Sequence, residues 1–125
     1  MILDTNGLSA LADGELALES VLRSAAEVAV PVIVLGEYRY GIGQSRESHT
    51  YEQWLDEFIG NFRILDVDEE TAASYAGVRR DLKKAGTPIP SNDVWIAALC
   101  RQHKSSLVSR DHHFDLVPGI RRIDW

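Results

Sequence analysis

The sequence contains a single cysteine and no long apolar run. Cys100 is the only cysteine among 125 residues, so no disulfide can form within the chain. Since disulfides persist mainly in oxidising compartments, this composition favours the reducing cytoplasm. Met1 leads into strand-like sequence without a basic leader, and no apolar stretch approaches the roughly 20 residues of a membrane-spanning helix. We therefore expect an unprocessed, soluble, cytoplasmic protein that does not engage a membrane.

Basic residues are in short supply. The chain has 13 Lys and Arg against 19 Asp and Glu, a net charge of -6. This balance argues mildly against a nucleic-acid partner, because non-specific phosphate binding relies on a basic surface. A chain of 125 residues that is 45% hydrophobic and 26% charged supports one globular core and is too short for two. We therefore expect one domain over residues 1–125.

Short apolar segments alternate with helical patterns along the chain. This order predicts parallel strands joined by helical crossovers, in a three-layer α/β/α sandwich whose central parallel sheet has four to five short strands. The spacing predicts a helix from about Glu69 to Ala85 and another from Ser91 or Asn92 to about His103, with Gly and Pro residues between them. The expected strands cover residues 1–3, 28–30, 64–67 and 106–109.

Four carboxylates lie on separate segments that the fold could bring together. Asp4 follows the first strand and Asp111 follows the last, and open α/β sheets place their sites at the carboxyl ends of strands. Asp93 lies in the first turn of the last helix, on a row of apolar residues. Glu37 shares its helical row with apolar neighbours that include Tyr40. Because a charged residue on an apolar stripe needs a partner, we predict that the four acids converge.

Each acid also has a simpler interpretation. Asp4 could begin a turn, Asp93 could complement the helix dipole, and Glu37 could be solvated. Asp111 lies in a polar loop, where Asp115 competes with it for the fourth place. We favour Asp111.

A cluster of four carboxylates implies a bound cation. Two unit charges about 4 Å apart repel by roughly 4 kcal/mol at an effective dielectric of 20, so the acids need a cation or protons. Oxygen ligands suit Mg²⁺, with Mn²⁺ as a second possibility, and the number of ions stays open. The chemistry implied is phosphodiester hydrolysis by a metal-activated water. Zinc is disfavoured because His112 and His113 have no further His or Cys at zinc spacing.

The acidic balance changes once the cluster is set apart. The other 15 acids nearly balance the 13 basic residues, so RNA remains a possible partner. A solvated helix face is the simpler interpretation of the basic run from Arg79 to Lys84. Trp54, Trp95 and Trp125 could stack on bases, although large aromatics more often lie in cores and interfaces. The basic residues that could hold RNA are Arg39, Arg79, Arg80, Lys83, Lys84 and Arg110.

Four blocks of the sequence, in order, resemble the signature blocks of PIN-domain ribonucleases, and within that superfamily the VapC toxins of toxin–antitoxin pairs. The resemblance extends over the whole chain. One departure is that Pro31-Val32-Ile33-Val34 precedes the second block where many relatives have Ser or Thr, so a hydroxyl from that stretch is missing. The blocks are Ile2-Leu3-Asp4-Thr5-Asn6, Leu35-Gly36-Glu37-Tyr38-Arg39-Tyr40-Gly41, Pro90-Ser91-Asn92-Asp93-Val94-Trp95-Ile96-Ala97-Ala98 and Val108-Ser109-Arg110-Asp111-His112-His113-Phe114.

The resemblance implies a function and partners. It implies an endoribonuclease that uses Mg²⁺, forms a homodimer and is blocked by a VapB-type antitoxin. Asp4 and Asp93 would be the principal metal ligands, completed by Glu37 and Asp111. The residues implied at the rim of the site, toward ligands or substrate, are Asn6, Ser109 and Arg110.

Other functions remain open from the sequence alone. One is a PIN-like protein-binding module whose acids hold a structural cation, and another is a metal-dependent DNA nuclease or phosphatase.

Overall fold

A single parallel sheet organises the molecule. The computed structural model describes residues 1–125. Its five strands run in the order β3-β2-β1-β4-β5, and every neighbouring pair is parallel. The three-layer α/β fold predicted from the sequence is therefore confirmed. The strands are β1 (Ile2–Leu3), β2 (Ala29–Pro31), β3 (Arg63–Leu65), β4 (Leu107–Val108) and β5 (Arg122–Ile123).

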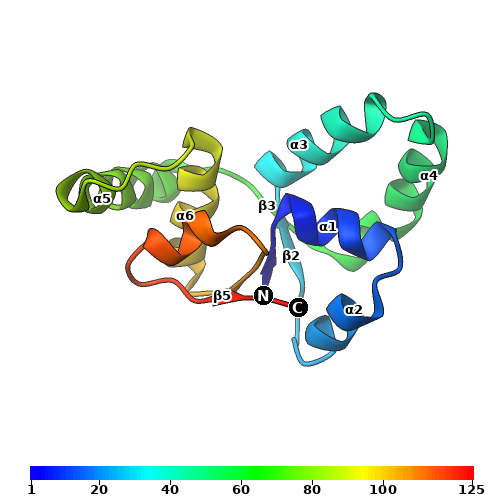
Figure 1. The fold of residues 1–125 in the computed structure, drawn as a ribbon, viewed down its shortest axis with the longest axis horizontal. Coiled ribbons are helices and arrows are strands. Elements are labelled where there is room, and N and C mark those ends of the chain that lie inside the picture. Colours follow the sequence, from blue (N-terminus) through cyan, green and yellow to red (C-terminus); the bar gives the residue numbers. More distant parts are fainter.

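Helices cover the sheet on two sides. In Figure 1 the first four helices lie on one side of the strands and the last two on the other, with the chain termini close together. None of these helices combines the length and apolar character needed to cross a bilayer. They are α1 (Thr5–Ala12), α2 (Leu16–Leu22), α3 (Val32–Gly43), α4 (Ser48–Phe58), α5 (Glu69–Ala85) and α6 (Ser91–His103), with short 3-10 segments η1 (Ile59–Asn61) and η2 (His112–Leu116).

The two predicted helices α5 and α6 have the expected bounds. A capping box between Asp68 and Thr71 begins α5, and Gly86 ends it in the left-handed region at φ 70°. Helix α6 packs along α5, and its residues from Ile96 to Cys100 are all buried. Most of its buried side chains belong to a core of 23 residues, to which every strand except β5 contributes. This burial fixes the position of the helix that begins near Asp93.

The predicted orientation of α3 is partly wrong. Its buried face follows Val34, Tyr38 and Ile42, whereas Tyr40 is 71% exposed. The reason is that the Tyr38 ring packs edge-on against Trp54 of α4, with ring centroids 6.3 Å apart. Glu37 therefore lies beside the buried stripe and is only partly buried.

The third strand also differs from its prediction. It covers Arg63–Leu65, and Val67, which was expected within it, is 40% exposed outside the sheet.

The segment after β4 is anchored by one aromatic side chain. Phe114 in η2 is 1% exposed. We expect Phe114→Ala to lower the free energy of unfolding by about 3–5 kcal/mol, because it leaves a cavity in the core. Urea denaturation measures this change. The matched control is Leu116→Ala, since Leu116 is 44% exposed in the same segment and should change stability by no more than about 0.5 kcal/mol. Equal urea midpoints for the two variants would show that Phe114 does not anchor the segment.

Candidate active site

Asp4 lies at the carboxyl end of the central strand β1 and is the N-cap of α1. Its Oδ1 accepts a hydrogen bond from the Thr5 backbone N–H at 2.8 Å. Its Oδ2 accepts from Ser109 Oγ at 2.7 Å and from Asn6 Nδ2 at 3.2 Å. Asp4 is only 4% exposed, and this burial raises its pKa against the lowering effect of the hydrogen bonds from Ser109 and Thr5. The nearby charges of Glu37 and Asp111 raise the pKa further.

Asp93 occupies the first turn of α6, which contacts η2, the segment after β4. Burial of its carboxyl raises the pKa to about 6, and the charges of Asp111 and Asp4 act in the same direction. A contact with His113, whose Nδ1 lies 3.2 Å from Asp93 Oδ2, lowers it in part. The loss of water around the carboxyl is therefore the largest effect on the pKa of Asp93, and the contact with His113 offsets part of it.

Asp111 faces Asp93 from the segment that follows β4. Its Oδ1 accepts from the His113 backbone N–H at 2.9 Å, and its own backbone N–H donates to Ser109 Oγ at 3.0 Å. His113 Nδ1 also lies 3.2 Å from Asp111 Oδ1. Ligand atoms of Asp93, Asp111 and His113 thus all lie within 4.8 Å of one another.

Sequence reasoning missed His113, because it weighed the histidines only as zinc ligands. The contact joins residues 20 positions apart, and the turn of η2 is needed to create it. The one signal available in the sequence was the position of His113 two residues after Asp111, within a polar loop.

The neighbouring acid Asp115 has a different environment. It accepts hydrogen bonds from Arg122 Nε at 2.8 Å and Arg122 Nη2 at 3.1 Å, and His112 Nδ1 lies 3.0 Å away. These contacts, those with Arg122 above all, lower the pKa of Asp115 to about 2. The structure therefore brings Asp111, and not Asp115, to the other acids.

Glu37 approaches the cluster from α3. Its Oε1 accepts a hydrogen bond from Thr5 Oγ1 at 3.0 Å, and its charge contributes to the raised pKa of Asp4. The sequence predicted no hydroxyl from the stretch before this helix, and the hydroxyl near Glu37 comes from Thr5 instead. Thr5 directly follows Asp4, so its position at the site could have been suspected from that adjacency.

The three predicted rim residues have unequal positions. Asn6 donates to Ser109 Oγ at 3.3 Å and accepts from the Arg110 backbone N–H at 3.1 Å, which ties α1 to the end of β4. Ser109 is completely buried. The Arg110 guanidinium instead contacts Glu15 Oε1 at 2.7 Å and lies 4.4 Å from the centroid of the Trp125 ring. Asn6 and Ser109 support Asp4, whereas the Arg110 side chain is held by other partners.

The donor set fits a hard divalent cation. Carboxylate oxygens of Asp93 and Asp111 and an imidazole nitrogen of His113 lie within 4.8 Å of one another. The charges of Glu37 and Asp111 act on Asp4, and that of Asp4 acts on Asp93, so Asp4 and Glu37 lie near this group but outside it. Oxygen-rich sites suit Mg²⁺ and Mn²⁺, and the latter also accepts nitrogen ligands. The residues that could hold such an ion are Asp4, Glu37, Asp93, Asp111 and His113.

Comparisons with known proteins agree with this geometry. Residues 1–120 match the family model described as PIN domain. Ribonuclease VapC2 of Rickettsia felis is 27% identical over 99 residues, which cover 78% of this chain and 74% of that protein. Ribonuclease VapC5 of Mycobacterium tuberculosis is 26% identical over 125 residues, which cover 98% of this chain and 91% of that protein.

Solved structures share the same fold. The structure of VapBC2 from Rickettsia felis bound to a promoter DNA fragment matches with a TM-score of 0.90 and 25% identity, over 99% of this chain and 97% of that chain. The structure of FitAcB from Neisseria gonorrhoeae matches with a TM-score of 0.86 and 26% identity, over 98% of this chain and 95% of that chain. The resemblance found in the four sequence blocks is thereby confirmed, and the chain belongs to the PIN-domain family.

Proposed function

We propose that this chain is a Mg²⁺-dependent endoribonuclease that hydrolyses RNA phosphodiester bonds and is the toxin of a toxin–antitoxin pair. The observation that supports this most strongly is the grouping of Asp93, Asp111 and His113 within 4.8 Å, with the charges of Asp4 and Glu37 close enough to shift pKa values at the same site. The ribonuclease names of its relatives support RNA, rather than DNA or a phosphate monoester, as the substrate.

The acids would have different roles in the reaction. Asp93, Asp111 and His113, with Asp4, would hold the ion, and Mn²⁺ could replace Mg²⁺. When bound, such an ion supplies Lewis acidity to the attacking water and positive charge to the phosphodiester transition state. Asp4 is fixed by hydrogen bonds on both carboxylate oxygens, so it is already oriented before substrate arrives.

Glu37 is held less completely than Asp4. Thr5 Oγ1 donates to Oε1 of Glu37, and no side chain donates to its Oε2. That second oxygen is therefore available to accept a hydrogen bond from the attacking water. Glu37 would orient this water at the edge of the acid cluster.

We also propose two protein partners, a VapB-type antitoxin and a second copy of this chain. The similar solved structures named VapBC2 and FitAcB support an antitoxin partner. The resemblance to VapC toxins implies the homodimer, and Leu16 and Tyr40 are large side chains that the single chain leaves 75% and 71% exposed. Light scattering should give twice the mass of one chain, and a monomer mass would contradict the homodimer.

The antitoxin, when added, should suppress RNA cleavage, and full cleavage in its presence would contradict that pairing.

The single cysteine supports a further proposal, that the chain acts in the cytoplasm. Cys100 is a free, buried thiol whose pKa is raised to about 12 by burial. Cell fractionation tests this proposal, and recovery of the chain outside the cytoplasm would contradict it.

Removing one acid tests the nuclease proposal. We expect Asp93→Asn to lower RNA cleavage on the order of 100-fold or more, because the variant keeps the side-chain volume and loses the charge that holds the ion. The assay is cleavage of a structured RNA and of a matched DNA with Mg²⁺, Mn²⁺ or EDTA. EDTA should abolish cleavage, and DNA should stay intact.

The control for this test is Asp56→Asn, which removes a charge from an exposed position on α4, outside the acid cluster. It should leave cleavage unchanged. Undiminished cleavage by Asp93→Asn would contradict the metal assignment.

The pH dependence of Mg²⁺ binding follows from the Asp93 pKa of about 6 in the metal-free protein. A carboxyl must lose its proton to hold a cation, so Mg²⁺ affinity should fall about tenfold for each pH unit below 6 and level off above 7. Calorimetric Mg²⁺ titrations at a series of pH values measure this. An affinity that is flat across this range would contradict the prediction.

The contribution of Asp93 to the free energy of unfolding of the metal-free protein should instead fall as the pH rises. Because the pKa of Asp93 is raised on folding, its stabilising contribution is complete below the ordinary value of 3.8 and is lost as pH rises through 6. Asp93→Asn should remove this component from the pH profile of unfolding.

A further inference from the structure

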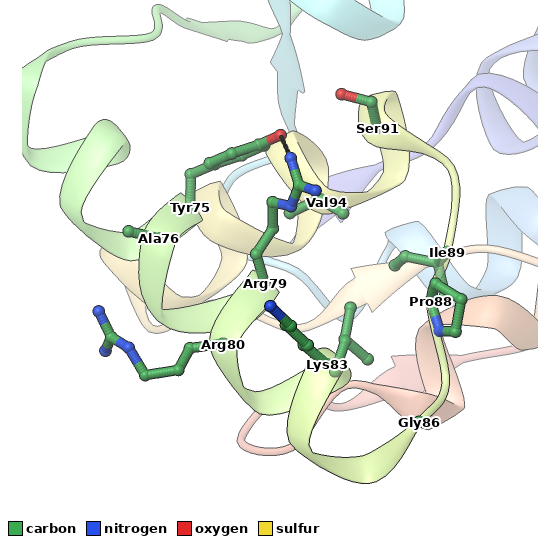
Figure 2. Close-up of a pocket in the computed structure, with 11 residues that line it drawn as sticks. Tyr75, Ala76, Arg79, Arg80, Lys83, Gly86, Pro88, Ile89, Ser91 and Val94 are labelled. Atoms are coloured by element: carbon green, nitrogen blue, oxygen red, sulfur yellow. Dashed lines mark hydrogen bonds between the residues drawn. The ribbon is translucent and has the colours of Figure 1, made fainter.

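A cavity separate from the acid cluster lies between α5 and the segment that leads into α6 (Figure 2). Its volume is about 580 Å³, within the range of small-molecule and cofactor sites. Side chains from both helices and from the connecting segment line it. The apolar and aromatic part of this lining includes Tyr75, Ala76, Leu82, Pro88, Ile89 and Val94.

The charged residues of this cavity are all basic. Arg79, Arg80 and Lys83 line it, and no acidic residue does. None of the three forms an ion pair, and the Arg79 guanidinium donates only to the Tyr75 hydroxyl, at 3.2 Å. This local positive charge stands out in a chain of net charge -6. Unpaired cations around a cavity attract anions, and phosphate is the anion that a nuclease meets.

The apolar part of the lining suits a flat ring. Leu82 and Val94 are buried at 2% and 3% exposure, and Pro88 and Ile89 lie on the connecting segment across from α5. Tyr75 is held in place by stacking on Trp95, with ring centroids 4.0 Å apart. In Figure 2 Arg80 points away from Pro88 and Ile89. A nucleotide combines an anionic phosphate with a base whose faces are apolar, so it matches both parts of this lining.

The cavity and the acid cluster share the start of α6. Ser91, the first residue of α6, belongs to its lining, and Asp93 follows two residues later. The two residues are about 3 Å apart along the helix axis and lie on different faces of it, so a strand that crosses the N-terminus of α6 passes from the acids to the cavity. A nucleic-acid strand lying across the acids could therefore place a neighbouring nucleotide in the cavity.

We propose that this cavity binds one nucleotide of the RNA strand beside the cleaved bond. Arg79 and Lys83 hold its phosphate, and its base lies against Pro88 and Ile89. The proposal rests on the nuclease function proposed above and adds where the strand is held. Positive charge at this position offsets the repulsion between the acid cluster and the RNA backbone.

Binding of RNA without cleavage tests this proposal. A fluorescent single-stranded RNA is titrated with Asp93→Asn protein, alone and combined with Arg79→Ala or Lys83→Ala, at several salt concentrations. We expect each combined variant to raise Kd about tenfold, because a charged hydrogen bond to phosphate is lost. The slope of log affinity against log salt should become shallower by about 0.7 for each lost phosphate contact.

The matched control is Lys84→Ala, which removes the same charge one residue further along α5, outside the cavity lining. A second pair of variants adds charge: Ala76→Glu places an acid in the lining, and Ala73→Glu places one elsewhere on α5. We expect only Ala76→Glu to weaken RNA binding. Equal effects of the Lys83 and Lys84 variants, or of the two Glu variants, would overturn the proposal.

Two further outcomes distinguish a nucleotide site from an interface between copies of the chain, and from a failure of the nuclease function. If the cavity variants leave RNA binding unchanged and convert a dimer to a monomer in light scattering, the surface is an interface between copies, and the nucleotide assignment is wrong. The unaltered protein could fail to cut RNA with Mg²⁺ while the cavity variants, and not their controls, bind RNA more weakly. In that case the nucleotide site stands, and the hydrolytic function is wrong.

Discussion

The buried carboxylate of Asp4 requires hydrogen-bond donors from the structure around it. A charge removed from water is costly unless hydrogen bonds replace the lost solvent, and Asp4 receives them from Thr5, Asn6 and Ser109. These donors come from the first turn of α1, which follows β1, and from the residue after β4, which pairs with β1. Thr5 and Asn6 follow Asp4 directly in the chain, and the pairing of β1 with β4 brings Ser109 to the same carboxylate.

Neighbouring acids acquire opposite properties from their surroundings. Burial and like charges raise the pKa of Asp93, while Arg122 and His112 lower that of Asp115. A cation held by the first acid would replace the lost solvent and offset the repulsion. The second already has its counter-charge and serves to fix the chain after Asp111. A difference in partners therefore separates an acid of the candidate site from an acid that stabilises the loop.

Local signals in the sequence predicted more than long-range ones. Helices α5 and α6 were predicted with their bounds because Gly86 and the prolines near it stop one helix before the next begins. Strands of two or three residues carry too few side chains for a periodicity, so β5 was not located and β3 was shifted. The face of α3 depended on the contact of Tyr38 with α4. Asp4, Asp93 and Asp111 could be picked out from their places at element ends and Glu37 from its apolar neighbours in α3, whereas the contacts of Thr5 and His113 depend on how distant segments pack.

The separation of the site's parts along the chain has a consequence for biosynthesis. The hydrogen bond between Ser109 and Asp4 spans 105 residues, and His113 comes later still. During translation the first strand emerges long before the strand that must pair beside it. The acid cluster therefore cannot assemble on a growing chain until the segment through His113 has left the ribosome. A nascent chain of this protein lacks the complete candidate site throughout most of its own synthesis.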